Sequence, residues 1–324
     1  MIYKKTLDII YVAFFNHERL KRSFESLTKF FLNSDYLINI VIFDNSSNLS
    51  LHNKYKDYFE TPISGFNIKY IFSKKNIGFG GGCNEASKYF NSDLIFLLNC
   101  DTCFSNSSLK NFDSMLDYCT SSSPIIGPKI ITKNGLIHSS CFSFDPISIL
   151  LKPLRHIRYI GRFTKLIPEY KYFKKRIDRI TYEGINKKIP SYVDWVSGCC
   201  MLLERQFFKN SGGFDERYFL YFEDVDLCRK AKTLDKKVIF NPNFEIIHDA
   251  QHSSRTMQGL IKSIFFNKLA RFHIISWLQY MFKWRNDFVV KFRHFVLRKK
   301  FKNTKNNKLN YELDFSNYEE IKND

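Results

Sequence analysis

The chain has 324 residues and a formal net charge of +18, and 44% of its residues are hydrophobic and 17% aromatic. This composition excludes an intrinsically disordered protein, and the length allows one large or two ordinary domains. No stretch approaches the roughly 18 apolar residues of a membrane-spanning helix. The apolar start at residues 1–16 contains Asp8 and is followed by no small-residue cleavage site, so a signal peptide is not expected either.

The positive charge is concentrated in two segments. Residues 152–190 carry 12 Lys or Arg against three acidic side chains, and residues 261–310 carry 13 against one. The rest of the chain has 25 basic and 28 acidic side chains. Because the excess charge is confined and no recognition motif accompanies it, nucleic-acid binding is not expected.

The second basic segment is interleaved with large apolar residues, including Trp277 and Trp284. This pattern predicts one or two amphipathic helices whose Lys and Arg side chains reach past an apolar face. Two interpretations stay open. The segment binds an anionic membrane surface, or it packs on the body of the protein with its charges solvated.

Eight cysteines are scattered along the chain without the spacing of a disulfide framework. The Cys100-x-x-Cys103 pair has no second pair to complete a zinc site. We therefore expect reduced, mostly buried thiols.

The first 130 residues alternate strand-like and helix-like stretches. Apolar, β-branched and aromatic runs predict buried strands, and the segment after the first run has apolar residues at helical spacing. The repeated strand–helix–strand order predicts an α/β protein with helices on both faces of an open sheet. The predicted strands are residues 7–16, 38–47, 67–73 and 93–101, and the predicted helices are residues 17–33 and 84–90.

Polar residues follow three of these predicted strands: Asn16, Asp44, Asn45, Asn99 and Asp101. In open α/β sheets ligands bind beyond the carboxyl ends of the strands. One such residue can be a turn former, and for Asp44 an Asx-turn is the structural alternative. Several at successive strand ends favour a binding site.

A glycine-rich stretch, "NIGFGGGCNEASKYF", covers residues 76–90 between the third strand and the second helix. Glycines let the backbone approach a ligand closely, and a helix N-terminus offers free N–H groups to an anion. A plain tight turn explains the stretch equally well. It matches neither the Walker pattern nor a dinucleotide fingerprint.

The stretch "YFLYFEDVDLCRK", residues 218–230, places Glu223, Asp224 and Asp226 directly after aromatic residues. Carboxylates beside apolar surface are costly unless they are paired, hydrated or used. Asp226 is expected to begin a helix, with Arg229 as a partner one turn later. An acidic helix start on a surface loop remains the structural alternative.

Seven ordered landmarks in the chain resemble the inverting family 2 glycosyltransferases of the GT-A fold, closest to their bacterial rhamnosyltransferase-like branch. They are "VAFFN" (12–16), "FDNSS" (43–47), "NIGFGGGCN" (76–84), "LLNCD" (97–101), "WVSGCCMLLERQFF" (195–208), "GGFDERYFLYFEDVDLCRK" (212–230) and "IIHDAQHSS" (246–254). The resemblance implies a Rossmann-like mixed, mostly parallel sheet flanked by helices, the nucleotide-diphospho-sugar transferase fold. It also implies a transferase domain at residues 1–255, with a basic insertion at about 150–190, followed by a basic, aromatic helical extension at 256–324.

The resemblance assigns roles to particular residues. Asp224 would be the catalytic base, and Glu223 would either contact the acceptor or tune Asp224. Asp101 and His248 would hold a divalent cation, Mn²⁺ or Mg²⁺; Asn99 stands where the family motif has its first acid. The implied donor-binding residues are Asn16, Asp44, Asn45, Asn76, Gly78, Gly81, Asn84 and Asn99. Trp195 and Gly198 would line the acceptor site, although Trp195 suits the core equally well.

The implied function is transfer of a sugar, with inversion, from a pyrimidine nucleotide-sugar to a glycan hydroxyl. The donor would be dTDP-rhamnose or a UDP-sugar, and the acceptor a lipid-linked glycan of bacterial surface polysaccharide (O-antigen or capsule) biosynthesis. The protein would be cytoplasmic and peripheral on the inner face of the membrane. Two alternatives remain: a sugar nucleotidyltransferase, and a non-catalytic scaffold that binds nucleotide-sugars.

Overall fold

The computed structural model describes residues 5–104, 108–144, 188–249 and 268–286. Its strands are β1 (Lys5–Ala13), β2 (Tyr36–Asp44), β3 (Phe66–Phe72), β4 (Leu94–Leu98), β5 (Thr102–Phe104), β6 (Ile125–Ile131), β7 (Ile137–His138), β8 (Cys141–Phe142), β9 (Ser191–Val193), β10 (Trp195–Val196), β11 (Cys200–Glu204) and β12 (Val238–His248). Its helices are α1 (His17–Phe31), α2 (Leu49–Glu60), α3 (Gly78–Ala86), α4 (Leu109–Asp117), α8 (Arg205–Asn210), α9 (Glu223–Thr233) and α11 (Lys268–Lys283).

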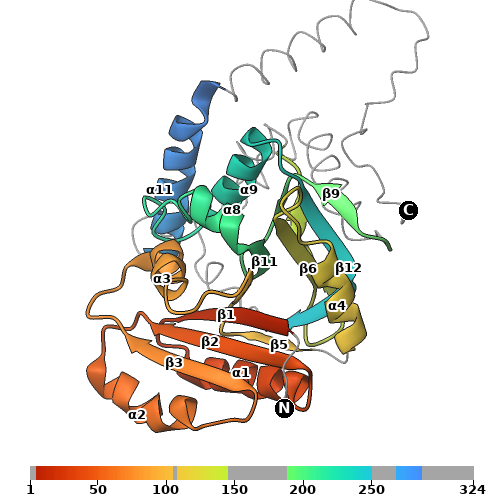
Figure 1. The fold of residues 1–324 in the computed structure, drawn as a ribbon. Helices are drawn as coiled ribbons and strands as arrows, with labels where there is room; N and C mark the ends of the chain where they lie inside the picture. The colour runs from red at the N-terminus through yellow and green to blue at the C-terminus, as the bar shows by residue number, and fades with distance from the viewer. Residues whose placement is uncertain (1–4, 105–107, 145–187, 250–267, 287–324) are drawn as a thin grey trace, which may run out of the picture.

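One mixed sheet forms the centre of the molecule, with the strand order β3-β2-β1-β4-β11-β6-β12-β5 (Figure 1). The strands β3, β2, β1 and β4 run parallel to one another. β11 then runs antiparallel to both β4 and β6. The predicted α/β architecture is confirmed, and the four strands expected from their apolar runs are β1 to β4.

Two hydrophobic clusters cover the two faces of the sheet, because side chains alternate along each strand. In β1, Ile9 and Tyr11 join the cluster that α1, α2 and α4 cover. Ile10 points the other way, into the cluster that α3, α8, α9 and α11 cover. Figure 1 shows α1 and α2 on the side of β1–β3 opposite to α3. The helices therefore flank the sheet on both faces, as predicted.

Helix α1 forms where the sequence predicted it. Leu20, Phe24, Leu27 and Phe31 recur at the helical period, and all four are buried against the sheet. Helix α2, at residues 49–60, was not predicted. Its Asn48 side chain accepts a hydrogen bond from the backbone N–H of Leu51 and so caps the helix.

The prediction of a helix at residues 84–90 is wrong in position, because α3 begins at Gly78 and ends at Ala86. Glycine has a low helix propensity, so the glycine run looked like a loop. In the structure it packs tightly instead. A Cβ on Gly82 would lie 2.8 Å from Val12 of β1, and one on Gly80 would lie 3.0 Å from Phe214. The glycines thus let α3 approach the sheet and the loop before α9.

The helix α11 packs on the body of the protein. Tyr280 is 1% exposed, and the Ser276 hydroxyl donates a 2.9 Å hydrogen bond to the carbonyl of Leu220. The described part of the basic C-terminal segment thus follows the packing interpretation on its inner face. No helix among the described residues is long and apolar enough to cross a bilayer. The basic insertion predicted at 150–190 lies outside the described residues up to 187.

Candidate active site

The two residues expected to hold a cation, Asp101 and His248, lie side by side. Strand β5 pairs antiparallel with β12, and this register sets Thr102 opposite His248. His248 Nε2 therefore lies 3.1 Å from Asp101 Oδ1. Arg19 of α1 approaches the other oxygen of Asp101, at 3.7 Å. Arg19 was not singled out from the sequence, although it follows Asn16 at the start of α1.

The chemistry of this pair fits a divalent cation. A carboxylate oxygen and an imidazole nitrogen are both ligands of Mn²⁺, and Mg²⁺ accepts the carboxylate. Among the described residues no group of three His, Cys, Asp or Glu side chains gathers around one point. The protein would thus provide two ligands, and diphosphate oxygens and water would complete the shell.

Asp224 stands at the second position of α9, partly exposed, with its carboxylate fixed by backbone groups. The N–H of Gly198 donates to Oδ2 at 2.9 Å, and the N–H of Val225 donates to Oδ1 at 2.8 Å. A Cβ on Gly198 would lie 3.0 Å from the Cβ of Asp224. Gly198, expected at the acceptor site, therefore lies directly against the predicted base.

The buried thiol of Cys199 is influenced by the charges of both Asp101 and Asp224. Burial raises the pKa of Cys199 to about 12; a hydrogen bond with Ser197 opposes the shift, and the nearby charges of Asp101 and Asp224 add to it. Cys199 directly follows Gly198, whose N–H donates to Asp224. The structure brings Asp101, His248 and Asp224 to one region at the end of β4, beside Asn99, whose N–H donates to the carbonyl of Cys199 at 2.9 Å.

Asp44 ends β2 and is fully buried. Its Oδ2 lies 3.1 Å from His52 Nδ1, 3.3 Å from His17 Nε2, and accepts a 2.9 Å hydrogen bond from Tyr70. Burial disfavours its charge, but the adjacent imidazole of His17 and hydrogen bonding from Ser46 outweigh burial and lower the pKa of Asp44 to about 2. The two histidines were missed from the sequence because they lie eight or more residues away from Asp44.

Most of the expected donor-binding asparagines hold the backbone around α3. Asn45 donates to the carbonyl of Gly78 at 2.8 Å and accepts from the N–H of Ile77 at 3.0 Å. Asn76 accepts from the N–H of Gly78 at 2.9 Å. Asn84 lies in the last turn of α3, not at its start. It binds both backbone groups of Phe214, each at 2.9 Å.

Two further expected donor residues are Asn16, which precedes α1, and Gly81, which lies within α3. The side chain of Asn16 accepts from the N–H of Phe14 at 3.0 Å, next to the N-terminus of α1. A Cβ on Gly81 would meet Ile77 only at ordinary contact distance, 3.5 Å. Gly81 therefore contributes less to the close packing of α3 than Gly82 does.

Three of the residues singled out from the sequence are buried: Trp195, Glu223 and Asp226. Trp195 is 6% exposed and stacks on Phe142 with ring centroids 4.1 Å apart, so it belongs to the core. Glu223 is 5% exposed at the first position of α9. Asp226 lies in the first turn of α9, as predicted, but is fully buried. The Arg229 guanidinium lies 4.7 Å above the ring of Phe144.

The comparisons with known proteins find glycosyltransferases. Residues 8–117 match the family described as "Glycosyl transferase family 2". A stretch of 106 residues, 30% of the chain, is 37% identical to the rhamnosyltransferase WbbL of Escherichia coli. Over 62 residues, 19% of its length, the chain is 44% identical to an N-acetylglucosaminyl-diphospho-decaprenol L-rhamnosyltransferase of Mycobacterium tuberculosis.

These matches cover 37% and 20% of the two relatives, well under two thirds of either. Among solved structures, GalNAc-T7 with UDP, GalNAc and Mn²⁺ is similar with a TM-score of 0.55 and 16% identity. That match covers 75% of this chain and 43% of the other, and it shows a shared fold. Residues 8–117 thus match the family 2 glycosyltransferases, parts of the chain are similar to rhamnosyltransferases, and the described fold is the GT-A fold.

Proposed function

We propose that the protein transfers a sugar, with inversion, from a pyrimidine nucleotide-sugar to a hydroxyl of a glycan acceptor. The observation that carries this proposal is geometric: the N–H of Asn99, two residues before Asp101 of the Asp101–His248 pair, donates to the carbonyl of Cys199, and the preceding Gly198 donates to Asp224. The names of the relatives support L-rhamnose as the sugar, with a UDP-sugar as the alternative donor.

Asp224 acts as the general base in this proposal. Its carboxylate takes the proton of the acceptor hydroxyl while that oxygen bonds to the anomeric carbon and the bond to the diphosphate breaks. The N–H groups of Gly198 and Val225 hold the carboxylate in one orientation. A single displacement of this kind inverts the anomeric configuration. A divalent cation held by Asp101 and His248 would neutralise charge on the diphosphate leaving group.

Asp44 serves the base of the nucleotide. It remains ionised, and a carboxylate is the group that accepts a hydrogen bond from the ring N–H of uracil or thymine. Because Asp44 is buried among His17, His52 and Tyr70, entry of the base requires one of these side chains to move. Asn45, Asn76 and Asn84 contribute by shaping the loop beside the nucleotide.

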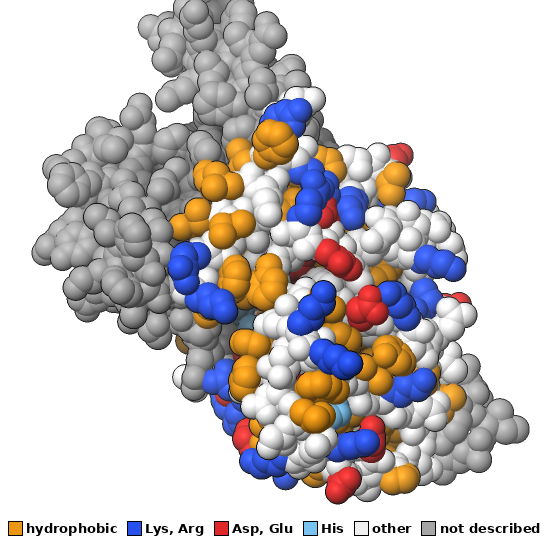
Figure 2. Space-filling view, turned by 90° about the vertical axis from the view of Figure 1, so that its left-hand side faces the viewer, with side chains coloured by type: hydrophobic (Ala, Val, Ile, Leu, Met, Phe, Trp, Pro, Cys, Tyr) orange, Lys and Arg blue, Asp and Glu red, His pale blue; other side chains and the backbone are white. Residues whose placement is uncertain are grey.

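The outer face of α11 supports a location at a membrane surface. The acceptor there would be a lipid-linked glycan of bacterial surface polysaccharide. Ile275, Leu278 and Phe282 are 50%, 54% and 70% exposed on this helix. Lys268 and Arg271 are also exposed there, and α11 contains no acidic residue. Figure 2 shows hydrophobic side chains among Lys and Arg on the side of the molecule where α11 lies. Anionic lipid attracts such a surface by about 1 kcal/mol per basic residue.

Donor hydrolysis by the purified protein tests the reaction class. The protein is supplied with Mn²⁺ or Mg²⁺ and a panel of UDP-, dTDP- and GDP-sugars, and release of nucleoside diphosphate is measured. We expect release from one pyrimidine donor, dependent on metal and lost in Asp101→Ala. Formation of pyrophosphate from a nucleoside triphosphate would support the nucleotidyltransferase alternative. Tight nucleotide binding without turnover, with or without candidate acceptors, would support the scaffold.

A further inference from the structure

The connection that leads into α9 has an unusual backbone conformation. Tyr221 and Phe222 have φ angles of +71° and +69°, in the left-handed region that aromatic residues rarely adopt. They stand directly before Glu223 and Asp224. A strained backbone of this kind persists only where its surroundings over-determine it, and such positions gather at active sites.

Helix α11 provides these surroundings. The ring of Tyr280 lies 5.3 Å from the ring of Phe222, and the ring of His273 lies 5.4 Å from it. One turn away, the Ser276 hydroxyl donates to the carbonyl of Leu220 at 2.9 Å. The strained connection is therefore enclosed by side chains from a helix about fifty residues further along the chain.

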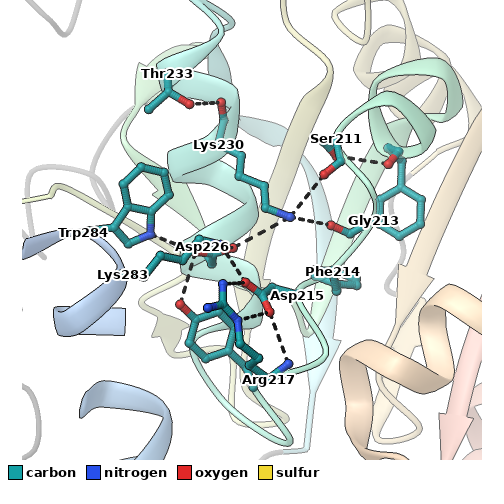
Figure 3. A network of polar contacts seen from close by, with 12 residues as sticks. Ser211, Gly213, Phe214, Asp215, Arg217, Asp226, Lys230, Thr233, Lys283 and Trp284 are labelled. Atoms are coloured by element: carbon teal, nitrogen blue, oxygen red, sulfur yellow. Dashed lines mark hydrogen bonds and ion pairs between the residues drawn. The ribbon is translucent and has the colours of Figure 1, made fainter. Parts of the chain in front are cut away.

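A polar clamp joins the end of α11 to α9. We use this name for Asp226, Lys283 and Trp284. Lys283 Nζ lies 2.8 Å from Asp226 Oδ2, and Trp284 Nε1 donates to Oδ1 at 2.8 Å (Figure 3). Lys283 also lies 2.7 Å from Asp215, before the strained connection. The clamp thus holds both ends of the connection at once.

The buried carboxylate of Asp226 makes the clamp depend on its hydrogen-bond donors. Asp226 is fully buried, so its charge is stable there only while its donors are in place. The hydroxyl of Tyr218 also donates to it, at 3.2 Å. Asp226 shares the first turn of α9 with Asp224, two residues earlier. Any rotation of this turn moves the Asp224 carboxylate relative to Gly198.

We propose that α11 belongs to the catalytic machinery: the clamp of Asp226, Lys283 and Trp284 positions the first turn of α9 so that Asp224 faces the reacting hydroxyl. None of the three touches the substrate, so they are positioning residues. The kinetic part of this proposal rests on the proposed function. The structural part, control of α9 by α11, does not.

Hydrogen exchange on the full chain tests the structural part. Lys283→Met removes the ammonium group, Trp284→Phe removes only the indole N–H, and Lys268→Met makes the same exchange at the exposed start of α11. The clamp predicts at least about tenfold faster amide exchange in the first turn of α9 for Lys283→Met and Trp284→Phe. Lys268→Met should behave like the wild type. Unchanged exchange in both clamp variants would overturn the proposal; if Lys283→Met does not fold, Trp284→Phe decides.

Steady-state kinetics test the catalytic part. Lys283→Met should lower kcat by about tenfold to a hundredfold, as misplaced catalytic groups do, with the donor KM changed less than about threefold. Lys283→Arg should recover part of the rate. In the Asp224→Asn background Lys283→Met should add no further loss, because the two changes affect one group. Equal losses in both backgrounds would overturn the positioning role. An unaffected Asp224→Asn variant would instead refute the proposed function.

Discussion

The backbone N–H of Gly198 donates a 2.9 Å hydrogen bond to Oδ2 of Asp224, 26 residues further along the chain. This contact ties the turn before β11 to the first turn of α9. The contact fixes the carboxylate through a backbone group. Because a Cβ at position 198 would lie 3.0 Å from the Cβ of Asp224, glycine lets the two segments come this close.

Gly198→Ala should therefore impair catalysis more than folding. The new Cβ would lie 3.0 Å from the Cβ of Asp224 and push the carboxylate away from its position. We expect kcat to fall by roughly tenfold to a hundredfold with little change in donor affinity. Comparison of kcat with the donor dissociation constant measures this.

Gly135→Ala is the matched control. Gly135 has a φ of +73°, and no atom of the described residues lies within 4 Å of the place that a Cβ would take there. The alanine therefore costs stability through its backbone alone. It should reduce the midpoint of unfolding and leave kcat unchanged. Equal losses of kcat in both variants would mean that Gly198 acts through stability, contrary to the role given to it here.

The Asp101–His248 pair predicts a specific metal-binding defect. His248→Ala should weaken binding of Mn²⁺ in the presence of a nucleoside diphosphate by at least about tenfold, because in the proposed site the described residues would supply only Asp101 and His248 as ligands. Electron paramagnetic resonance of free Mn²⁺ measures this without turnover. The ring centroids of His138 and His248 lie 5.8 Å apart. The control variant His138→Ala should retain the wild-type affinity. Equal affinity in the wild type and His248→Ala would remove His248 from the site.

Gly78→Ala predicts a large loss of stability. Gly78 has a φ of +82°, and a Cβ there would overlap the carbonyl oxygen of Phe219. Strain and overlap together should lower the free energy of unfolding by more than about 2 kcal/mol. Urea denaturation measures the change. Gly81→Ala, where contacts would be ordinary, should be neutral or stabilising; the opposite order of the two variants would contradict this packing of α3.

Asp44 predicts a pH-dependent contribution to stability. Its pKa falls from about 3.8 in the unfolded chain to about 2 in the folded one, so ionised Asp44 stabilises the fold above the higher value. The contribution is about 2 kcal/mol at neutral pH and disappears as the pH falls toward 2. Asp44→Asn should thus be less stable at pH 7, with a difference from the wild type that shrinks below pH 4.

Urea denaturation across this pH range measures the difference, with Asp57→Asn as the exposed control on α2. Asp57→Asn should change the free energy of unfolding by less than about 0.5 kcal/mol at every pH. A difference between Asp44→Asn and the wild type that stays constant from pH 7 to pH 3 would exclude the charge of Asp44 as its cause.

Local sequence patterns predicted the strands and the helix whose pattern of apolar residues is set by burial. β1 to β4 follow from apolar runs and α1 from its period, because burial on one or both faces dictates both patterns. The start of α3 at Gly78 was not predictable in this way. Its glycines are unfavourable for an isolated helix, and only the approach to Val12 and Phe214 makes them suitable.

The candidate site divides in the same manner. The order of motifs predicted roles for Asp101, His248 and Asp224; in the structure Asp101 contacts His248, and Asp224 contacts Gly198. The contacts of Asp226 with Lys283 and Trp284 join residues 57 and 58 positions apart, so no local pattern could reveal them. The backbone contacts of Asn45 and Asn84 were likewise not predictable, because a polar side chain that braces a loop and one that binds a donor have the same sequence signature.

Asp224→Asn is the variant that tests whether Asp224 removes the acceptor proton. Asparagine keeps the shape and can still accept from the N–H of Gly198, but it cannot take a proton. With the donor found by the hydrolysis panel and a lipid-linked glycan acceptor, we expect transfer to fall by at least about a thousandfold while the donor dissociation constant changes little. Transfer within about tenfold of the wild-type rate would contradict the account.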